Sequence, residues 1–244
     1  DIYIDTGKQN YTVVVKKGDP IDEEKIQLFL EKGVTKFYIT RTEKESFYDF
    51  FLNIVEQVDY KFDARKVGRD LAVQLQVLAM VFYKLQQSGL DEKLLNSAKR
   101  TLENNIEMIN NTKSLKKLLG GIIGKNENIL EHSMTTNMIC QILLKELRWD
   151  IHTSQLKISM AAFFHDISIT EFDEDIEVLE SKATYDIDSL KELNPNFFNH
   201  PLKAAELFDK MKNMPSDVAQ IISSHHELPN GKGFPKGLFG ARTV

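Results

Sequence analysis

Six histidines lie in the second half of the chain, and five of them fall within or at the end of segments with helical apolar spacing. These five are His132, His165, His200, His225 and His226. One histidine in such a place is most often a hydrogen-bonded core residue. Burying five titratable rings without strong partners is costly, whereas neutral imidazoles are common ligands of transition metals. The five histidines therefore predict a metal site.

Asp166 follows His165 directly and adds a carboxylate to this set. Because a carboxylate has two oxygens, Asp166 can bridge two cations while His165 holds one of them. His225 and His226, at the last turn of another helix, would then hold the second cation, in a site where distant helices converge. A nitrogen-rich ligand set with one bridging carboxylate favours iron, manganese or zinc over calcium or magnesium.

The elements that must position these residues are helices. Apolar spacing predicts helices over residues 128–147, 154–167, 200–212 and 216–226. His200 is predicted to open the third of them, with Pro201 in its first turn, and Ser216 or Asp217 is predicted to cap the fourth. The sequence therefore predicts an all-α domain over residues 123–244.

The first part of the chain has a different pattern. Residues 1–62 predict a small α/β regulatory domain, with strands over 12–15 and 36–40 and a short amphipathic helix between them that ends at Gly33. Residues 63–122 predict connecting helices, which either pack the domains together or form a dimer surface. The expected fold class is mainly α, with a helical metal-binding domain after a small α/β domain.

Composition limits the partners of the chain. It has 244 residues, 42% of them hydrophobic, and a net charge of −5. This acidic balance argues against a nucleic-acid duplex as partner, while a local cluster of cations can still attract a small anion. The single cysteine, Cys140, is predicted to pack in the core and indicates a reducing cytoplasm. No apolar run reaches the ~20 residues that span a bilayer.

The motifs "EHS", "HD" in "FFHDIS", "NHP" and "HHE", followed by the loop "NGKGFP", together resemble the HD-GYP family. That family is a branch of the HD-domain metal phosphohydrolases, and its members are typically phosphodiesterases that cleave the second messenger cyclic di-GMP. The resemblance covers residues 124–240, about half of the chain.

The resemblance implies roles for individual residues. One metal would be held by His132, His165 and Asp166, and the other by Asp166, His200, His225 and His226. Both are expected to be divalent transition metals, iron first, with manganese or zinc as alternatives, and Asp166 is expected to be catalytic. Glu227 is expected to orient a histidine. The residues expected to bind the nucleotide are Lys203, Asn230, Gly231, Lys232, Gly233, Phe234 and Lys236.

Several positions depart from the family pattern. The usual "HDIGK" is "HDISI" here, so Ile169 stands where a lysine is expected. In the loop, Asn230 replaces an aspartate and Phe234 replaces a tyrosine. Relatives also carry an aspartate ligand in a helix after the loop, whereas this chain has none after Asp217. Either the first metal lacks that ligand, or the protein continues past residue 244.

These features lead to one main hypothesis and two alternatives. The main one is a two-metal cyclic di-GMP phosphodiesterase whose activity is lowered by the missing lysine, aspartate and tyrosine. The first alternative is a metal-containing receptor that binds a cyclic dinucleotide without turnover and signals through the N-terminal domain, a protein partner or a homodimer. The second is an HD-type phosphohydrolase of mononucleotides, which the glycine loop disfavours.

Overall fold

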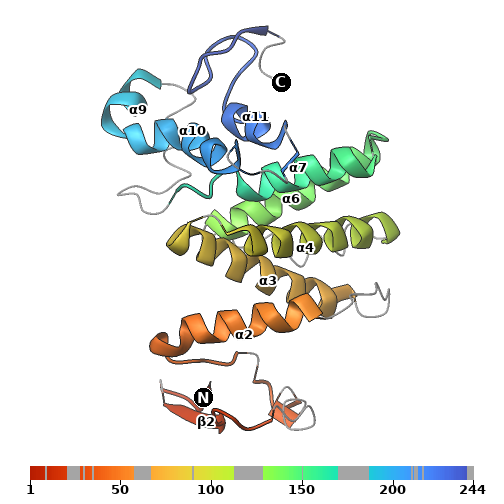
Figure 1. Ribbon diagram of the computed structural model, residues 1–244, viewed down its shortest axis with the longest axis vertical. Coiled ribbons are helices and arrows are strands. Elements are labelled where there is room, and N and C mark those ends of the chain that lie inside the picture. Colours follow the sequence, from red (N-terminus) through yellow and green to blue (C-terminus); the bar gives the residue numbers. More distant parts are fainter. Residues whose placement is uncertain are drawn as a thin grey trace. The chain divides into compact units, whose positions relative to one another are not determined.

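The protein forms two compact units, Asp1–Val58 and Asp59–Val244, in a computed structural model (Figure 1). The predicted boundaries at residues 62 and 122 stay predictions, as does a separate connecting role for residues 63–122. The structure describes residues 1–8, 10–20, 28–29, 31–34, 36–57, 67–89, 91–112, 129–149, 151–169, 187–209, 211, 214–215 and 217–240.

The first unit contains a small antiparallel sheet of β1 (Ile2–Asp5) and β2 (Tyr11–Val15), followed by the short helix η1 (Arg41–Glu43) and by α2 (Lys44–Gln57). The predicted strand over 36–40 is wrong, because only Tyr38 pairs there, in a single bridge to Tyr3. Thr40 already serves as the N-cap of η1, so this segment has no length left for a ladder. Most of the helix predicted before Gly33 lies outside the described residues.

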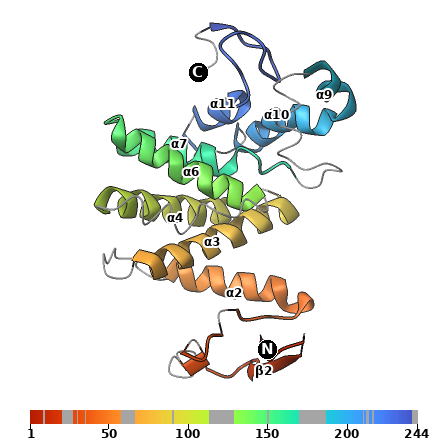
Figure 2. The ribbon, with the colours of Figure 1, turned by 180° about the vertical axis from the view of Figure 1, so that it is seen from behind.

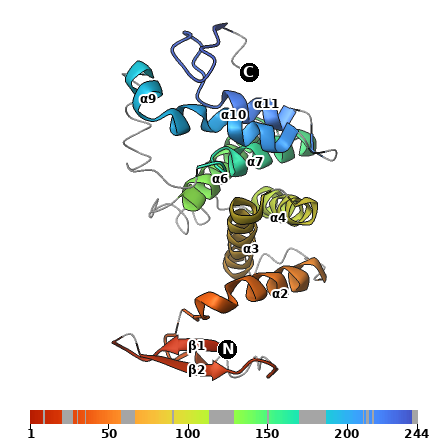
Figure 3. The ribbon, with the colours of Figure 1, turned by 60° about the vertical axis from the view of Figure 1, so that its left-hand side comes forward.

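The second unit is helical, which confirms the predicted mainly α fold class. Along the chain α3 packs on α4, α4 packs on α6 and α7, and α7 packs on α6 and α11. Helix α10 packs on α9 and α11, and Figures 2 and 3 show α10 and α11 beside α7. The helices are α3 (Val67–Ser88), α4 (Glu92–Asn111), α6 (Ile129–Glu146), α7 (His152–Phe164), α9 (Ile187–Leu193), α10 (Pro195–Asp209) and α11 (Asp217–Ser224).

Helix α4 shows why these segments are helical. Asp91 caps its start by accepting hydrogen bonds from the backbone N–H groups of Lys93 and Leu94, at 2.8 and 3.1 Å. Its end is closed by Lys145 of α6, whose Nζ donates to the carbonyls of Ile109 and Asn110. The apolar residues between these caps are buried at the predicted 3.6-residue spacing; they include Leu95, Ala98, Leu102, Ile106 and Ile109.

The end of α7 is fixed by an aromatic cluster. Phe163 and Phe164 are fully buried. Phe163 meets Phe82 of α3 with ring centroids 5.6 Å apart, and Phe164 meets Phe208 of α10 at 5.0 Å. Aromatic pairs of this kind contribute about 0.5–1.5 kcal/mol beyond the area that they bury. The chain therefore leaves α7 at a rigid point, immediately before the "HD" pair.

Helix α10 begins earlier than the sequence predicted. His200 was expected to open it, yet the helix starts at Pro195, so His200 and Pro201 lie inside it. A proline is favoured at the first helical position. Pro195 occupies that position, which the sequence predicted near Pro201. The earlier start also buries the rings of Phe197 and Phe198.

The predictions for Cys140, for membrane-spanning helices and for the cap of α11 have different outcomes. Cys140 is only partly buried, so its expected place in the core was wrong, although its burial is sufficient to raise the pKa of the thiol. Every helix in the described part of the chain is too short or too polar to cross a lipid bilayer. Of the two predicted caps of α11, Ser216 lies outside the described residues, and Asp217 is the first residue of the helix itself, where its carboxylate accepts a hydrogen bond from Lys157 Nζ at 2.6 Å.

Candidate metal centre

Four of the motif histidines meet in two pairs. The Nε2 atoms of His132 and His165 lie 3.2 Å apart, and those of His200 and His225 lie 3.1 Å apart. The first pair comes from α6 and the end of α7, and the second from α10 and the turn after α11. The sequence placed these residues in separate helices, and the fold brings their imidazoles together.

Asp166 lies between the two pairs. Its Oδ2 is 3.0 Å from Nε2 of His165 and 3.7 Å from Nε2 of His132. Its Oδ1 is 3.1 Å from Nε2 of His200 and 3.6 Å from Nε2 of His225. Each carboxylate oxygen therefore faces one pair, which is the arrangement of a carboxylate that bridges two cations.

The inward direction of the rings is set by backbone carbonyls. The Nδ1 atoms of His165, His200 and His225 lie 2.9, 2.6 and 2.7 Å from carbonyl oxygens three residues earlier. A carbonyl can only accept, so each Nδ1 carries a proton and donates it. The neutral ring then presents the lone pair of Nε2 to the centre, as in metal sites where a backbone carbonyl fixes the tautomer.

Each of these carbonyls lies where the helix itself supplies no N–H four residues later or ends nearby. Ala162 and Ile222 lie in the last turns of α7 and α11, where carbonyls lack a partner within the helix. Phe197 lies inside α10, but the residue four positions later is Pro201, which has no N–H to donate. Residue 201 therefore cannot donate to the carbonyl of Phe197, and Nδ1 of His200 donates to it.

The centre fits a pair of cations better than it fits protons alone. With Nδ1 protonated, the Nε2 lone pairs of His200 and His225 face each other at 3.1 Å beside a carboxylate oxygen. Such lone pairs repel unless a proton or cation lies between them. Asp166 Oδ1 is buried without a hydrogen-bond partner, although buried oxygens are normally satisfied.

The protonation of the centre suits metal binding. Burial alone would raise the pKa of Asp166, but the electrostatic influence of the adjacent His165 and His200 outweighs it and holds that pKa well below its usual range. Burial, and then the proximity of His165, lowers the pKa of His225 to about 3. Burial and the adjacent His225 lower the pKa of His226 to about 2. At neutral pH these side chains are deprotonated, as metal ligands must be.

Two groups of potential ligands result. His132, His165 and Asp166 form one group, and His200, His225 and His226 form the other, with the ligand atoms of each within 4.8 Å of one another. Divalent metals suit both groups, since imidazole nitrogen and a carboxylate are ligands for iron, manganese and zinc. All six residues predicted as ligands belong to these groups. His152, the sixth histidine, is exposed at the start of α7 and belongs to neither.

The glycine loop packs against the second group. The ring of Phe234 is 2% exposed and stacks on His226, with centroids 4.4 Å apart and an angle of 15° between the planes. Gly233 has no room for a side chain, because a Cβ there would lie 2.5 Å from Glu227 Cα. Both residues were predicted to bind a nucleotide directly. Both are buried and pack behind the histidines, and their part in binding a nucleotide stays a prediction.

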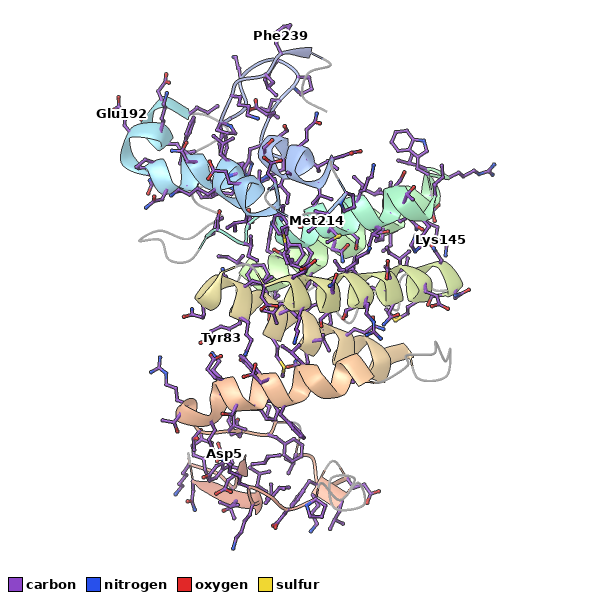
Figure 4. All side chains as sticks on the ribbon, in the orientation of Figure 1. Asp5, Tyr83, Lys145, Glu192, Met214 and Phe239 are labelled. Carbon is purple, nitrogen blue, oxygen red and sulfur yellow. The ribbon has the colours of Figure 1, made fainter. Side chains whose placement is uncertain are left out.

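Glu227 holds this loop in place. The sequence predicted that Glu227 orients a histidine. Its carboxylate instead accepts hydrogen bonds from the backbone N–H groups of Lys236 and Leu238, at 2.6 and 2.7 Å. Phe239 lies at the outer end of the loop, where its side chain is 73% exposed (Figure 4). The loop therefore has a fixed base beside His226 and an exposed end.

Ile169, which stands where the resemblance expects a lysine, is 1% exposed. It belongs to a buried cluster that also contains Phe234, the position where the resemblance expects a tyrosine. The other members of this cluster are Leu190, Phe197 and Phe198. The two departures from the family pattern thus meet in one apolar cluster behind the second histidine group.

The polar residues predicted to bind the nucleotide lie at the surface. Lys203 is exposed and donates to Asn196 Oδ1, and Lys232 is exposed in the loop. Lys236 is exposed, with Nζ 3.4 Å from Ser223 Oγ. Asn230 accepts the backbone N–H of Lys232, and Gly231 has a φ of +73°.

Sequence reasoning missed that Pro201, which has no N–H, leaves the carbonyl of Phe197 to accept from His200, although a proline directly after a histidine was a visible signal.

Comparisons with known proteins bear on the family and the fold of the chain. The sequence model of the HD domain family matches residues 104–242, which run from α4 to the glycine loop. The solved structure of Bd1817, an HDG"Y"P protein from Bdellovibrio bacteriovorus, has a TM-score of 0.64 with this chain. The two sequences are 17% identical, over 98% of this chain and 76% of that one. No curated protein sequence matches the chain. The HD-domain match and the shared fold confirm the predicted resemblance.

Proposed function

Because the chain belongs to the HD domain family of metal-dependent phosphohydrolases, we propose that it is a phosphodiesterase that hydrolyses cyclic di-GMP. One observation carries the proposal: Asp166 presents one carboxylate oxygen to each of two histidine pairs, as a dinuclear hydrolase requires.

The residues of the chain have distinct parts in this proposal. His132 and His165 would hold one divalent cation, His200, His225 and His226 would hold the other, and Asp166 would offer one carboxylate oxygen to each. Two such cations supply the charge that lowers the pKa of a water and neutralises the oxygens of a phosphodiester. We favour iron, with manganese or zinc as alternatives, because the ligands are mostly imidazoles.

The substrate would be attracted by lysines near the centre. Lys203 follows His200 in α10 by one turn, and Lys232 and Lys236 lie in the loop that starts at Glu227. These cations suit the two phosphates of a cyclic dinucleotide, within a protein whose net charge is −5. We propose that Asn230 and Gly231 offer the polar surface of the loop to the nucleotide, while Gly233 and Phe234 shape it from behind.

An activity assay tests the proposal. The purified protein is loaded separately with iron, manganese and zinc, and incubated with cyclic di-GMP. Linear dinucleotide or GMP should appear with at least one metal and should be absent with Asp166→Asn, which keeps the size of the side chain and removes its charge. If the wild type gives neither product with any of the metals, the phosphodiesterase proposal is wrong.

A second function is favoured by the burial of Ile169 and Phe234. Neither position offers a polar group to a phosphate, so the charge stabilisation expected from a lysine and a tyrosine is missing. Losing one such interaction typically costs a hundredfold or more in rate. A protein with an intact metal centre and such losses can act as a receptor that binds a cyclic dinucleotide and signals without turnover.

Binding and turnover separate these two functions. Equilibrium binding of cyclic di-GMP to the metal-loaded protein, without product over several hours, supports the receptor. Turnover at rates near about 1 s⁻¹, the low end of ordinary enzymes, would exclude it.

A further inference from the structure

Gln86, near the end of α3, contacts the backbone immediately after Asp166. Its Nε2 lies 3.2 Å from the carbonyl oxygen of Ile167 and 2.8 Å from that of Ile169. The reverse orientation of the amide would place its oxygen against two carbonyl oxygens, which repel, so the donor must face them. One side-chain amide thus satisfies two carbonyls of the segment 166–169.

The same segment is held from its other side. Ser168 Oγ donates to the carbonyl of His200 at 2.9 Å, which links it to α10. Within the segment, the N–H of Ile169 donates to the carbonyl of Asp166 at 2.9 Å. The backbone that carries the bridging carboxylate is therefore bonded to α3 through Gln86 and to the second histidine group through Ser168.

The position of Asp166 has little tolerance. Its two oxygens lie 3.0 and 3.1 Å from the nearest histidine nitrogens, so a small shift of the backbone would bring one oxygen nearer to its pair and take the other away. Removing a group that fixes a ligand in this way commonly lowers metal affinity by about 10- to 100-fold.

We propose that Gln86 is a positioning residue that holds Asp166 midway between the two histidine pairs. This inference rests on the proposed dinuclear centre. Gln86 touches neither the ligand atoms nor a substrate; it acts through the backbone of residues 167–169. It also makes the end of α3 part of the metal centre, although α3 carries none of the motif residues.

Two substitutions test this role. Gln86→Met keeps the length of the side chain and removes the donor, whereas Gln86→Lys keeps a donor. The matched control is Gln87→Met, because Gln87 is the next residue of α3 and is exposed. Amide hydrogen exchange of Ile167 and Ile169 is measured on the metal-free proteins, and affinity for Mn(II) and the visible spectrum with Co(II) are measured on the same samples.

The N–H groups of Ile167 and Ile169 donate to the carbonyls of Phe164 and Asp166. We expect their exchange to rise about tenfold in Gln86→Met, because the segment loses the two bonds that tie its carbonyls to α3 and opens more often. The affinity for Mn(II) should fall about tenfold at both sites, because both sites share Asp166, and the Co(II) spectrum should change. Gln86→Lys should return exchange, affinity and spectrum most of the way to the wild-type values, and Gln87→Met should match the wild type.

The arms of the experiment have separate meanings. If exchange at Ile167 and Ile169 is unchanged in Gln86→Met, Gln86 does not hold this segment and the inference is wrong. If exchange rises while affinity and spectrum stay the same, the segment does not position Asp166 and the inference is also wrong. If the wild type itself binds no metal, the dinuclear centre is refuted, and the inference is refuted with it.

Discussion

The Nε2 atoms of His200 and His225 lie 3.1 Å apart, although both rings already donate their Nδ1 proton to a helix carbonyl. Two neutral imidazoles cannot form a hydrogen bond in this arrangement, because neither has a proton left on Nε2. The His132–His165 pair repeats the approach at 3.2 Å on the other side of Asp166. The approach of His200 and His225 is accounted for if this pair shares a cation.

The two histidine groups should lose metal independently. His132→Ala removes a ligand from the first group and leaves the second intact, while His226→Ala does the reverse. The metal content measured by elemental analysis should fall from about two metals per chain to about one in each variant. The site without the substitution keeps all of its histidines and therefore its metal. His152→Ala is the control, because His152 is exposed and lies outside both groups. A complete loss in either variant would mean that the sites do not bind separately.

Pro201→Ala should weaken the second site without weakening the fold. The new N–H of residue 201 would donate to the carbonyl of Phe197 and compete with Nδ1 of His200. We expect about a tenfold loss of affinity for one of the two metals in titration calorimetry, with no decrease in the melting temperature.

Pro195→Ala provides the matched control for this variant. Pro195 is the first residue of α10, where an N–H would have no partner within the helix. Metal affinity should therefore match the wild type. Equal affinities in Pro201→Ala and Pro195→Ala would show that the carbonyl of Phe197 does not orient His200.

Glu227→Gln should loosen the loop and spare the metals. The carboxylate accepts two backbone N–H groups, and an amide can accept at only one of its two ends. Amide exchange at Lys236 and Leu238 should accelerate by tenfold or more, since hydrogen bonds to a charged group contribute about 1.5–3 kcal/mol each. Glu206→Gln, at an exposed position of α10, is the control. Loss of metal in Glu227→Gln would favour the histidine-orienting role that the sequence suggested.

Ile169→Lys should destabilise the protein instead of restoring a missing cation. Ile169 is 1% exposed and packs in the cluster with Phe197 and Phe234, so a lysine there would be buried without a partner. We expect the free energy of unfolding in urea to fall by about 3 kcal/mol. Leu143→Lys, at a position that is 53% exposed, should change it little. An unchanged stability in Ile169→Lys would mean that this side chain can reach solvent.

The sequence predicted the metal centre better than its surroundings. Imidazole and carboxylate residues carry their chemistry in their identity, so His165, Asp166 and the pair His225–His226 could be assigned without coordinates. The helical class followed from apolar spacing, which reports directly on which face is buried.

What the sequence could not predict depends on side-chain direction. Glu227 lies next to a histidine in the chain, yet its carboxylate points to the backbone of the loop. Phe234 belongs to the expected substrate loop, yet its ring is buried against His226. Gln86 precedes Asp166 by 80 positions, and only the packing of α3 brings its amide to residues 167 and 169. No local pattern encodes such contacts.

The central claim is that the carboxylate of Asp166 bridges two metals, and metal content after Asp166→Asn tests it most directly. Wild type, Asp166→Asn and the exposed control Asp209→Asn are loaded identically with iron or manganese, desalted, and analysed for metal per folded chain. We predict about two metals in the wild type and in Asp209→Asn, and close to none in Asp166→Asn, because both sites lose the same charged ligand. Retention of both metals by a folded Asp166→Asn protein would contradict the account.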